Sequence, residues 1–310
     1  MEMKRKLVKQ GVRALTITLP SDWVGKNSLN PGDEIDLIEQ DSSLVISTEA
    51  KQPLKEITVD LSGLIPRLAD RFMARSYQKG YDKIIVRFDN PEIMQAVQKK
   101  VSELMGFEIL RADKNELEIQ IIAGQLDIDF DTMLRRALIL LMDMSKTCHD
   151  AWKKGDNKAL ENIFYQDFDV NKFTYFCLRY LNKSSKVVAF GTSIFYYLVE
   201  SLEDLGDELK ALGKLLAQTK PKKEILTILE KMNEMFRISY EFFYKPEKEK
   251  AIRAYQLSKE IEGLIDKALN TKDVNEIKAL ISIDFSTRII YHLTTMRLDT
   301  LKELGGEAAK

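Results

Sequence analysis

The sequence predicts a multidomain α+β fold with three parts. These are a β-rich N-terminal module (residues 1–50), a small βαβαββ middle domain (54–124) and an all-α C-terminal bundle (130–305). Up to Ile122, apolar residues alternate with polar ones in short runs, whereas from Asp131 onward they recur at helical spacing. Five of the seven prolines also lie within the first 91 residues, which places most chain breaks in the β-rich part.

The N-terminal module is expected to contain four short strands and one helical turn. Leu15, Ile17 and Leu19 alternate with polar residues, as in a half-buried strand, and a short helix is expected at 22–26 with Ser21 as its cap. Two further strands are expected on either side of a turn at 40–43. About 50 residues is marginal for independent folding, and such units usually need oligomerisation. We therefore expect an obligate homodimer.

Charge is unevenly distributed within this module. Its first strand and turn carry the candidate DNA-contacting residues Lys4, Arg5, Lys6, Lys9 and Arg13, whereas its later strands carry Asp33, Glu34, Asp36, Glu39 and Asp41. A basic edge duplicated by dimer symmetry could neutralise phosphates on both sides of a DNA groove. The alternative is a solvated strand with ordinary surface charges.

This module resembles the AbrB/MazE/SpoVT swapped-hairpin DNA-binding family. The resemblance implies that two chains interleave their hairpins, and that basic residues of the first strand and loop contact DNA. Arg5, Lys6, Lys9 and Arg13 match those positions. Some relatives bind a protein partner instead of DNA, so both outcomes stay open.

The middle domain alternates strand and helix patterns. Strands are expected at 57–61, 83–88, 107–110 and 117–122, and helices at 64–78 and 91–105. This is a sheet with helices on one face, ferredoxin- or ACT-like in style. It has no glycine-rich phosphate loop and no convergent acid/base set, so a connecting role is favoured over a ligand-binding one.

The C-terminal part is helical and internally duplicated. Residues 142–143 and 165–166 recur 90 positions later, and 206–209 recur 92 positions later. Three helices are expected in each copy, at 132–154, 157–181 and 186–217, and at 222–243, 247–269 and 274–304. Cys148 falls on an apolar stripe with Leu134, Leu138, Leu141 and Trp152, which favours a packed thiol. His149 and His292 are expected to be structural.

The third helix of the first copy carries four carboxylates beside its leucine seam. This carboxylate stripe consists of Glu200, Glu203, Asp204 and Asp207. Like charges at this spacing cost a few tenths of a kcal/mol per pair. We therefore expect solvent, Lys210 and Lys214, or a bound cation to offset them. Gly206 in mid-helix indicates a close approach of another element.

The bundle resembles the PhoU family of phosphate-uptake regulators, tandem three-helix bundles with a metal-binding E/D-xxx-D motif. Glu203 and Asp207 fit that motif, and Glu200, Asp204 and Asp299 are weaker candidates, since Thr295 replaces the acidic partner of Asp299 in the second copy. The resemblance implies a divalent metal or iron or zinc, and the oxygen ligands suit Mg²⁺, Ca²⁺ or Mn²⁺. Two carboxylates need further ligands, such as Asp143 or Asp167. The alternative is a solvated acidic face.

Composition limits the location and class of the protein. The net charge is −1, so any DNA binding must come from the local basic patch, and two cysteines fit a reducing cytosol. The charged N-terminus does not look like a signal peptide, and the apolar runs are too short for membrane insertion. We find no P-loop, GxGxxG, HExxH or GxSxG motif, so no enzyme and no catalytic residue is expected.

Together, the three parts resemble archaeal phosphate uptake regulators of the PhoU family that carry an AbrB-like N-terminus. This resemblance implies a cytoplasmic, dimeric transcription regulator that binds an operator through its hairpins. Its bundle would sense or relay phosphate-transport status, with a phosphate-transporter ATPase subunit or a sensor protein as partner. The alternative is an adaptor that does not bind DNA, and instead docks on a phosphate ABC transporter ATPase and inhibits it.

Overall fold

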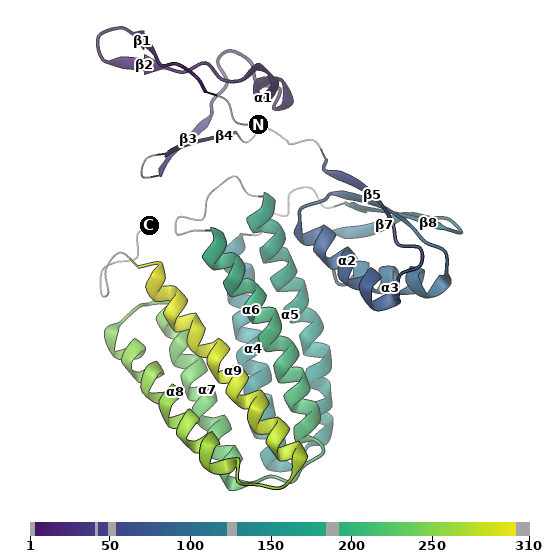
Figure 1. Ribbon diagram of the computed structural model, residues 1–310, viewed down its shortest axis with the longest axis vertical. Helices are drawn as coiled ribbons and strands as arrows, with labels where there is room; N and C mark the ends of the chain where they lie inside the picture. Colours follow the sequence, from purple (N-terminus) through teal and green to yellow (C-terminus); the bar gives the residue numbers. More distant parts are fainter. Residues whose placement is uncertain (1–3, 41–42, 49–53, 123–128, 184–191, 302–310) are drawn as a thin grey trace. The chain divides into compact units, whose positions relative to one another are not determined.

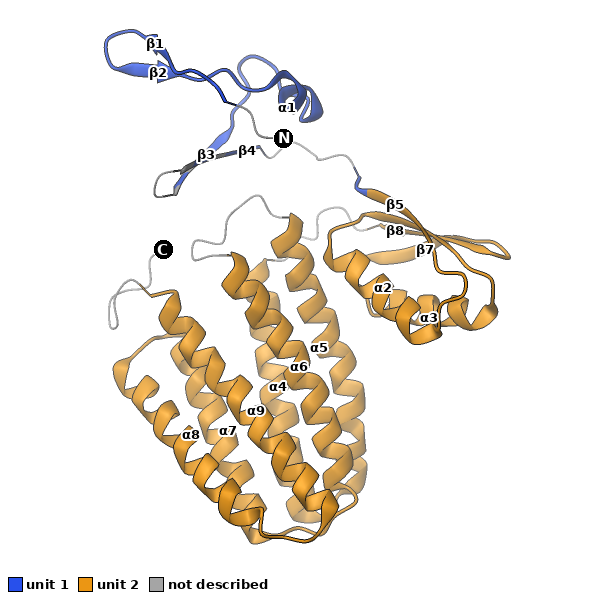
Figure 2. Cartoon of the chain, in the orientation of Figure 1, with its two compact units in different colours: residues 1–55 blue, residues 56–310 orange. Residues whose placement is uncertain are grey.

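The computed structural model describes residues 4–40, 43–48, 54–122, 129–183 and 192–301. The chain forms two compact units, an N-terminal unit of residues 1–55 and a C-terminal unit of residues 56–310 (Figure 2). The C-terminal unit combines an α/β part with a helical bundle (Figure 1). This arrangement is a multidomain α+β architecture, as the sequence predicts.

The N-terminal unit consists of two separate antiparallel hairpins and one short helix. Strands β1 (Val8–Gln10) and β2 (Ala14–Thr16) form the first hairpin, and β3 (Asp36–Gln40) and β4 (Ser43–Ser47) form the second. Gly11 starts the first turn with a φ of 73°, a value that glycine adopts without steric cost. The predicted cap of helix α1 (Ser21–Lys26) is wrong. Ser21 lies inside the helix, and Pro20 precedes it without a side-chain hydrogen bond.

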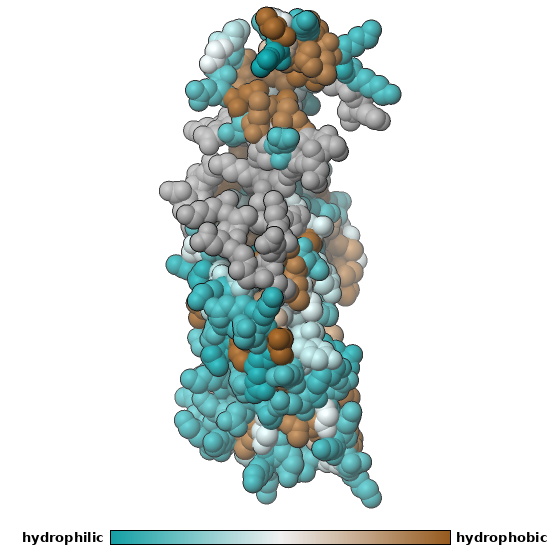
Figure 3. Space-filling view, turned by 90° about the vertical axis from the view of Figure 1, so that its left-hand side faces the viewer, coloured by the Kyte–Doolittle hydropathy of each residue, from teal (hydrophilic) through white to brown (hydrophobic). Residues whose placement is uncertain are grey.

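The described residues of the N-terminal unit build no hydrophobic core. None of those with an assigned exposure is buried, and several large apolar side chains are exposed, from Ile17 at 48% to Val12 at 90%. Figure 3 shows these apolar side chains at the surface, at the top of the view. The exposed apolar residues are Leu7, Val8, Val12, Leu15, Ile17, Leu37 and Leu44. Because apolar burial is the main favourable term in folding, this unit needs a partner surface.

The α/β part has the predicted βαβαββ order. Its elements are β5 (Glu56–Asp60), α2 (Pro66–Gln78), β6 (Lys83–Arg87), α3 (Pro91–Ser102), β7 (Phe107–Ala112) and β8 (Glu116–Ile121). The strand order is β5-β6-β8-β7, with β5 parallel to β6 and the other pairs antiparallel. Both helices lie on one face of the sheet (Figure 1). Alternate strand residues such as Ile84, Val86, Leu117 and Ile119 face them and are fully buried.

The bundle consists of two sets of three helices. The first set is α4 (Phe130–Lys154), α5 (Asn157–Lys183) and α6 (Thr192–Leu216), and the second is α7 (Lys223–Tyr244), α8 (Lys248–Ala268) and α9 (Val274–Asp299). Within each set every helix contacts the other two. Across the sets, equivalent helices meet, since α4 contacts α7 and α6 contacts α9. One continuous hydrophobic core runs through both sets, as expected for an internal duplication.

Local sequence signals explain where the first bundle helix begins and ends. Asp129 accepts a hydrogen bond from the Thr132 amide at 2.8 Å, which caps α4, and Gly155 ends it in the left-handed conformation with φ 71°. The stripe of Leu134, Leu138, Leu141, Cys148 and Trp152 is fully buried, which confirms the predicted packing of Cys148. No helix in the described ranges is long and apolar enough to cross a membrane.

The α/β part is packed firmly against α5 of the bundle. Arg179 on α5, only 5% exposed, donates hydrogen bonds to the carbonyl oxygens of Tyr77 at 3.0 Å and Tyr81 at 2.6 Å, and it pairs with the buried Asp82. Lys183 contacts the same carboxylate at 2.5 Å. A buried, forked guanidinium with several acceptors fixes orientation as well as contact. The α/β part therefore cannot move freely on the bundle.

Candidate functional site

The basic residues of the N-terminal unit lie on its first hairpin and the segment before it. Lys4, Arg5 and Lys6 precede β1, Lys9 is in β1, and Arg13 is in the turn; all five are exposed. No acidic residue lies between positions 4 and 13. The acidic residues come after α1 along the chain, at Asp33, Glu34, Asp36 and Glu39. Asp41 lies outside the described residues. The predicted charge polarity along the chain is therefore present on the surface.

This arrangement is suited to contacts with an anionic backbone. Long cationic side chains on an exposed hairpin can reach phosphates at little desolvation cost, and each neutralised phosphate releases counterions. Among the acidic residues after α1, Asp33 is engaged locally, because it accepts a hydrogen bond from the Asn30 amide at 2.7 Å. The same hairpin exposes Val8, Val12 and Leu15. Basic and apolar side chains thus share one coreless hairpin.

The carboxylate stripe on α6 faces cationic side chains from α2 of the α/β part. Arg75 forms a two-pronged ion pair with Glu200, with one nitrogen–oxygen distance of 3.0 Å. Arg71 lies 3.5 Å from Glu203, whose carboxylate also accepts a hydrogen bond of 3.3 Å from the Tyr175 hydroxyl. Glu203 is only 4% exposed. The first two carboxylates of the stripe are therefore paired across an internal interface.

Asp207, the last carboxylate of the stripe, is paired with a cation from within the bundle. Lys210 on α6 bridges Asp207 on its own helix and Asp167 on α5, with a distance of 2.5 Å to Asp167. The second oxygen of Asp167, Oδ1, is buried without a hydrogen-bond partner. A Cβ at Gly206 would lie 3.2 Å from this oxygen and 3.2 Å from Val170. The predicted close approach at Gly206 is confirmed, and α5 is the element that approaches.

Burial shapes the acidity of these groups. Desolvation raises the pKa of Glu203, of Asp167 and, together with its carboxylate neighbours, of Asp204. Burial lowers the pKa of Lys210, but its hydrogen bonds to Asp167 and Asp207 outweigh that effect and raise it overall. The hydrogen bond to Glu200 likewise raises the pKa of Arg75. Lys210 and Arg75 therefore stay charged beside the carboxylates that they pair with.

The predicted metal ligands of the first set of helices are paired with cationic side chains or exposed. Across the described residues, no three His, Cys, Asp or Glu side chains come together as a metal-binding group. Glu203 and Asp207 each face a different cationic side chain, and Asp143 and Asp204 are exposed. The metal site at Glu203 and Asp207 stays a prediction.

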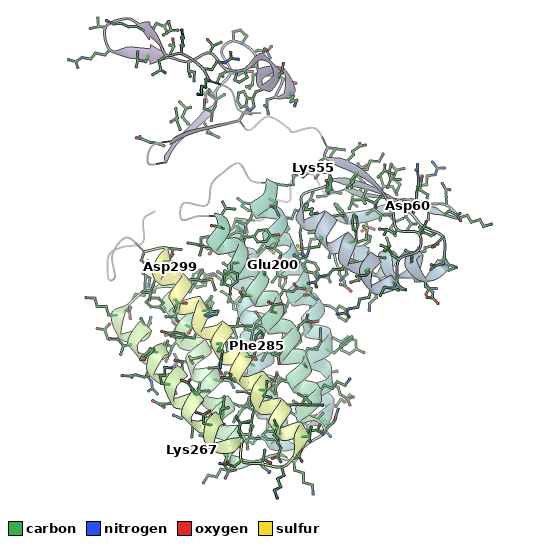
Figure 4. All side chains as sticks on the ribbon, in the orientation of Figure 1. Lys55, Asp60, Glu200, Lys267, Phe285 and Asp299 are labelled. Carbon is green, nitrogen blue, oxygen red and sulfur yellow. The ribbon has the colours of Figure 1, made fainter. Side chains whose placement is uncertain are left out.

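Asp299 lies apart from the other predicted ligands. It lines a shallow depression of about 420 Å³ with Ser193, Tyr197 and His292, among others. Figure 4 shows Asp299 at the end of α9, away from Glu200 on α6. A second depression, of about 520 Å³, is lined by α3, β7 and Lys172 of α5.

Sequence reasoning missed the residues that hold the two parts of the C-terminal unit together. Arg71 and Arg75 are spaced i, i+4 on α2, which matches the spacing of carboxylates on a facing helix. Nothing local indicates that this helix meets α6, which lies 125 residues further along the chain. The apolar stripe of α5 carried no sign that Arg179 is buried within it. These contacts are long-range and could be found only from the fold.

Comparison with known protein families matches the N-terminal unit. The family model described as antidote-toxin recognition MazE, bacterial antitoxin, matches residues 8–55. The N-terminal unit is therefore similar to the MazE and AbrB swapped-hairpin domains, as its residues indicated. No curated protein and no solved structure matches the chain.

Proposed function

We propose that this protein is a dimeric DNA-binding transcription regulator. The observation that carries the proposal is the first hairpin and the segment before it, which together expose five cationic side chains beside apolar residues that no described core covers. Pairing of two such hairpins would bury the apolar residues and bring two basic edges together. The similarity of residues 8–55 to MazE-type domains supports both dimerisation and DNA contact.

The helical bundle gives the regulator a second function. Its duplicated three-helix sets and the Glu203-xxx-Asp207 segment resemble PhoU proteins. On that resemblance we propose that the bundle senses or relays phosphate-transport status, by contact with a transporter ATPase subunit or a sensor protein. The proposed location is the cytoplasm, and the proposed role involves no catalysis. An effector would act by favouring one arrangement of the dimer.

Salt-dependent binding to promoter DNA tests the proposal. Each neutralised phosphate contributes about 0.9 to the slope of log affinity against log salt. Lys9→Ala/Arg13→Ala removes two cations from each chain, four per dimer, so the slope should become shallower by about 3.6. The control is Lys55→Ala/Lys114→Ala, which removes the same charge from exposed positions outside the hairpin. Wild-type protein that fails to bind any promoter fragment at low salt would refute the DNA-binding role.

A protein-docking role is the second candidate. The exposed apolar residues on the hairpins, and the similarity to an antitoxin-type family, also suit a dimer that binds another protein. In that case the protein would act as an antitoxin-like partner, or as an adaptor that inhibits a phosphate-transporter ATPase. Gel-shift and sedimentation experiments on one sample separate the two roles, because an adaptor stays dimeric and binds no DNA at low salt.

A further inference from the structure

Three helix–helix connections lie at one end of the bundle. They join α4 to α5, α6 to α7 and α8 to α9. With the adjoining helical turns, they comprise residues 151–160, 213–226 and 265–277. This end lies at the bottom of the view in Figure 1, and Figure 4 labels Lys267 there. The α/β part is attached near Arg179, at the other end of α5, and does not cover these connections (Figure 1).

The three connections carry nine exposed lysines, which form a surface that we call the lysine end. Its members are Lys153, Lys154, Lys158, Lys214, Lys220, Lys222, Lys223, Lys267 and Lys272. The same segments contain no arginine and five carboxylates, so their net charge is +4 in a chain whose net charge is −1. Positive charge is therefore concentrated at this end of the bundle.

Most of these lysines have no intramolecular ion pair. Within the described parts of the chain, Lys222 pairs with Glu276 at 2.6 Å, whereas the other eight lysines form no ion pair. On the bundle surface away from this end, most described lysines and arginines are paired with carboxylates. Examples are Lys172, Lys210, Lys231, Arg253 and Lys259. The lysine end thus differs from the rest of the bundle surface in pairing as well as in charge.

Three of the five carboxylates at this end are engaged by the fold. Asp156 accepts a hydrogen bond from the Ala159 amide at 3.0 Å, and Asp273 accepts one from the Asn275 amide at 2.9 Å, so both cap helices. Glu276 is only 5% exposed. These carboxylates are therefore not available to the eight unpaired lysines, whose charge can attract an external anion.

Hydrogen bonds between the connections hold the lysines on one surface. The buried indole of Trp152 donates to the Thr219 carbonyl oxygen at 3.2 Å, which joins the first connection to the second. Glu276 accepts hydrogen bonds from Lys222 and Thr271, both at 2.6 Å, which join the second connection to the third. The lysines are thus spread over a cross-linked end of the bundle instead of lying on independent loops.

Two apolar side chains are exposed beside the lysines. Leu269 is 39% and Val274 61% exposed, and they lie before and after Lys272 in the third connection. Basic residues around protruding apolar ones are typical of surfaces that lie on an anionic membrane. Lysine is a point charge without the fork that lets arginine bind a single phosphate group in two places. The only aromatic residue of the three segments, Trp152, is buried and cannot stack on bases.

We propose that the lysine end binds peripherally to an anionic lipid surface, with Leu269 and Val274 at the level of the headgroups. Each lysine near such a surface strengthens binding about fivefold, so a few lysines suffice for reversible attachment. This contact needs no membrane-spanning segment, and no helix in the described ranges could form one. The inference does not depend on DNA binding by the N-terminal unit.

Sedimentation of the full chain with lipid vesicles tests the proposal. At low salt, wild type should sediment with vesicles of equal parts phosphatidylglycerol and phosphatidylcholine, but not with phosphatidylcholine alone. About 0.5 M NaCl should release it, because salt screens exposed charges. The test variant Lys153→Gln/Lys220→Gln/Lys223→Gln should bind the anionic vesicles about a hundredfold more weakly. Its fold should be unchanged, since the three side chains are exposed and unpaired in the described structure.

Matched controls separate the lysine end from the other basic surfaces. Lys114→Gln/Lys146→Gln/Lys248→Gln removes the same charge from exposed positions elsewhere in the C-terminal unit and should bind vesicles like wild type. Lys9→Ala/Arg13→Ala, in the first hairpin, should also retain vesicle binding. Conversely, the test variant should bind promoter DNA as wild type does. Failure of the lipid contact and failure of the DNA contact are therefore distinguishable.

A variant of the apolar residues tests the orientation on the lipid. Leu269→Ser/Val274→Ser keeps every charge and should bind anionic vesicles about tenfold more weakly. The proposal is overturned if wild type does not sediment with anionic vesicles at low salt, or if the test variant binds them as its control does. It is also overturned if Leu269→Ser/Val274→Ser binds like wild type. Loss of DNA binding in the test variant, with vesicle binding intact, would instead assign the lysine end to nucleic acid.

Discussion

Replacement of Arg179 by alanine should destabilise the C-terminal unit more than any surface substitution. Arg179 and Asp82 are 5% and 3% exposed, and the guanidinium also donates to two backbone carbonyl oxygens and lies 4.9 Å from the Tyr77 ring centre. Loss of one partner of a buried ion pair costs about 3–5 kcal/mol. Lys183 still contacts Asp82 after the substitution, which favours the lower half of that range, about 3–4 kcal/mol.

Chemical denaturation of a Trp23→Phe background, followed by far-UV circular dichroism and by the fluorescence of Trp152, measures this loss. Arg111→Ala serves as the control, because its ion pair with Asp113 is exposed and should contribute at most about 1 kcal/mol. Arg179→Lys should fall between the two, since lysine retains the charge but cannot reach three acceptors in one plane. A free energy of unfolding for Arg179→Ala within about 1 kcal/mol of the control would show that the buried network does not anchor the α/β part.

Two further predictions concern the dimer and the thiols. Leu15→Asp places a charge among the exposed apolar residues of the first hairpin, so sedimentation should show a single chain of 35.7 kDa instead of a dimer. The control Leu110→Asp, at an exposed position of the α/β part, should leave the dimer intact. A Leu15→Asp protein that remains dimeric would contradict the pairing of these hairpins. Burial raises the pKa of Cys148 to about 12, and Cys177 is also buried. Neither thiol should therefore react with Ellman's reagent at pH 8 until denaturant is added. Rapid reaction of the native protein would refute the packing of these thiols in the hydrophobic core.

Elements with a strong local pattern could be predicted from the sequence. Most helices of the bundle begin and end within a few residues of the expected positions, because long apolar stripes, Asp129 and Gly155 define them locally. The expected start of the third helix at 186 and the expected end of the sixth helix at 304 lie outside the described residues. The succession of strands and helices along the chain of the α/β part could also be predicted, because its strands show period-2 alternation. The coreless state of the N-terminal unit follows from its short length, because about 50 residues is marginal for independent folding.

The partners of the carboxylate stripe could not be predicted in the same way. The sequence shows four acidic residues on one face of α6 and a need for positive charge, and it offered Lys210 as a neighbour, which the structure confirms at Asp207. The other cations come from α2, and only the docking of the α/β part brings them near. Local patterns report local spacing, whereas charge pairing between distant segments depends on how the segments pack. For the same reason, Gly206 indicated a close approach but did not identify α5.

Three helical glycines provide a graded test of packing in the bundle. Alanine favours a helix over glycine by about 1 kcal/mol, so Gly263→Ala in α8, with no atom within 4 Å of the new Cβ, should stabilise the protein by about that amount. At Gly213 the Cβ would lie 3.1 Å from the Leu160 carbonyl oxygen, which cannot move without the backbone of α5. Overpacking of this kind costs about 1–3 kcal/mol, so Gly213→Ala should be a net loss. Gly206→Ala should fall between them, because its nearest neighbours are side chains of Asp167 and Val170. Thermal unfolding of the three variants gives the order, and a Gly213→Ala protein as stable as Gly263→Ala would show that α5 and α6 are not in close contact at Gly213.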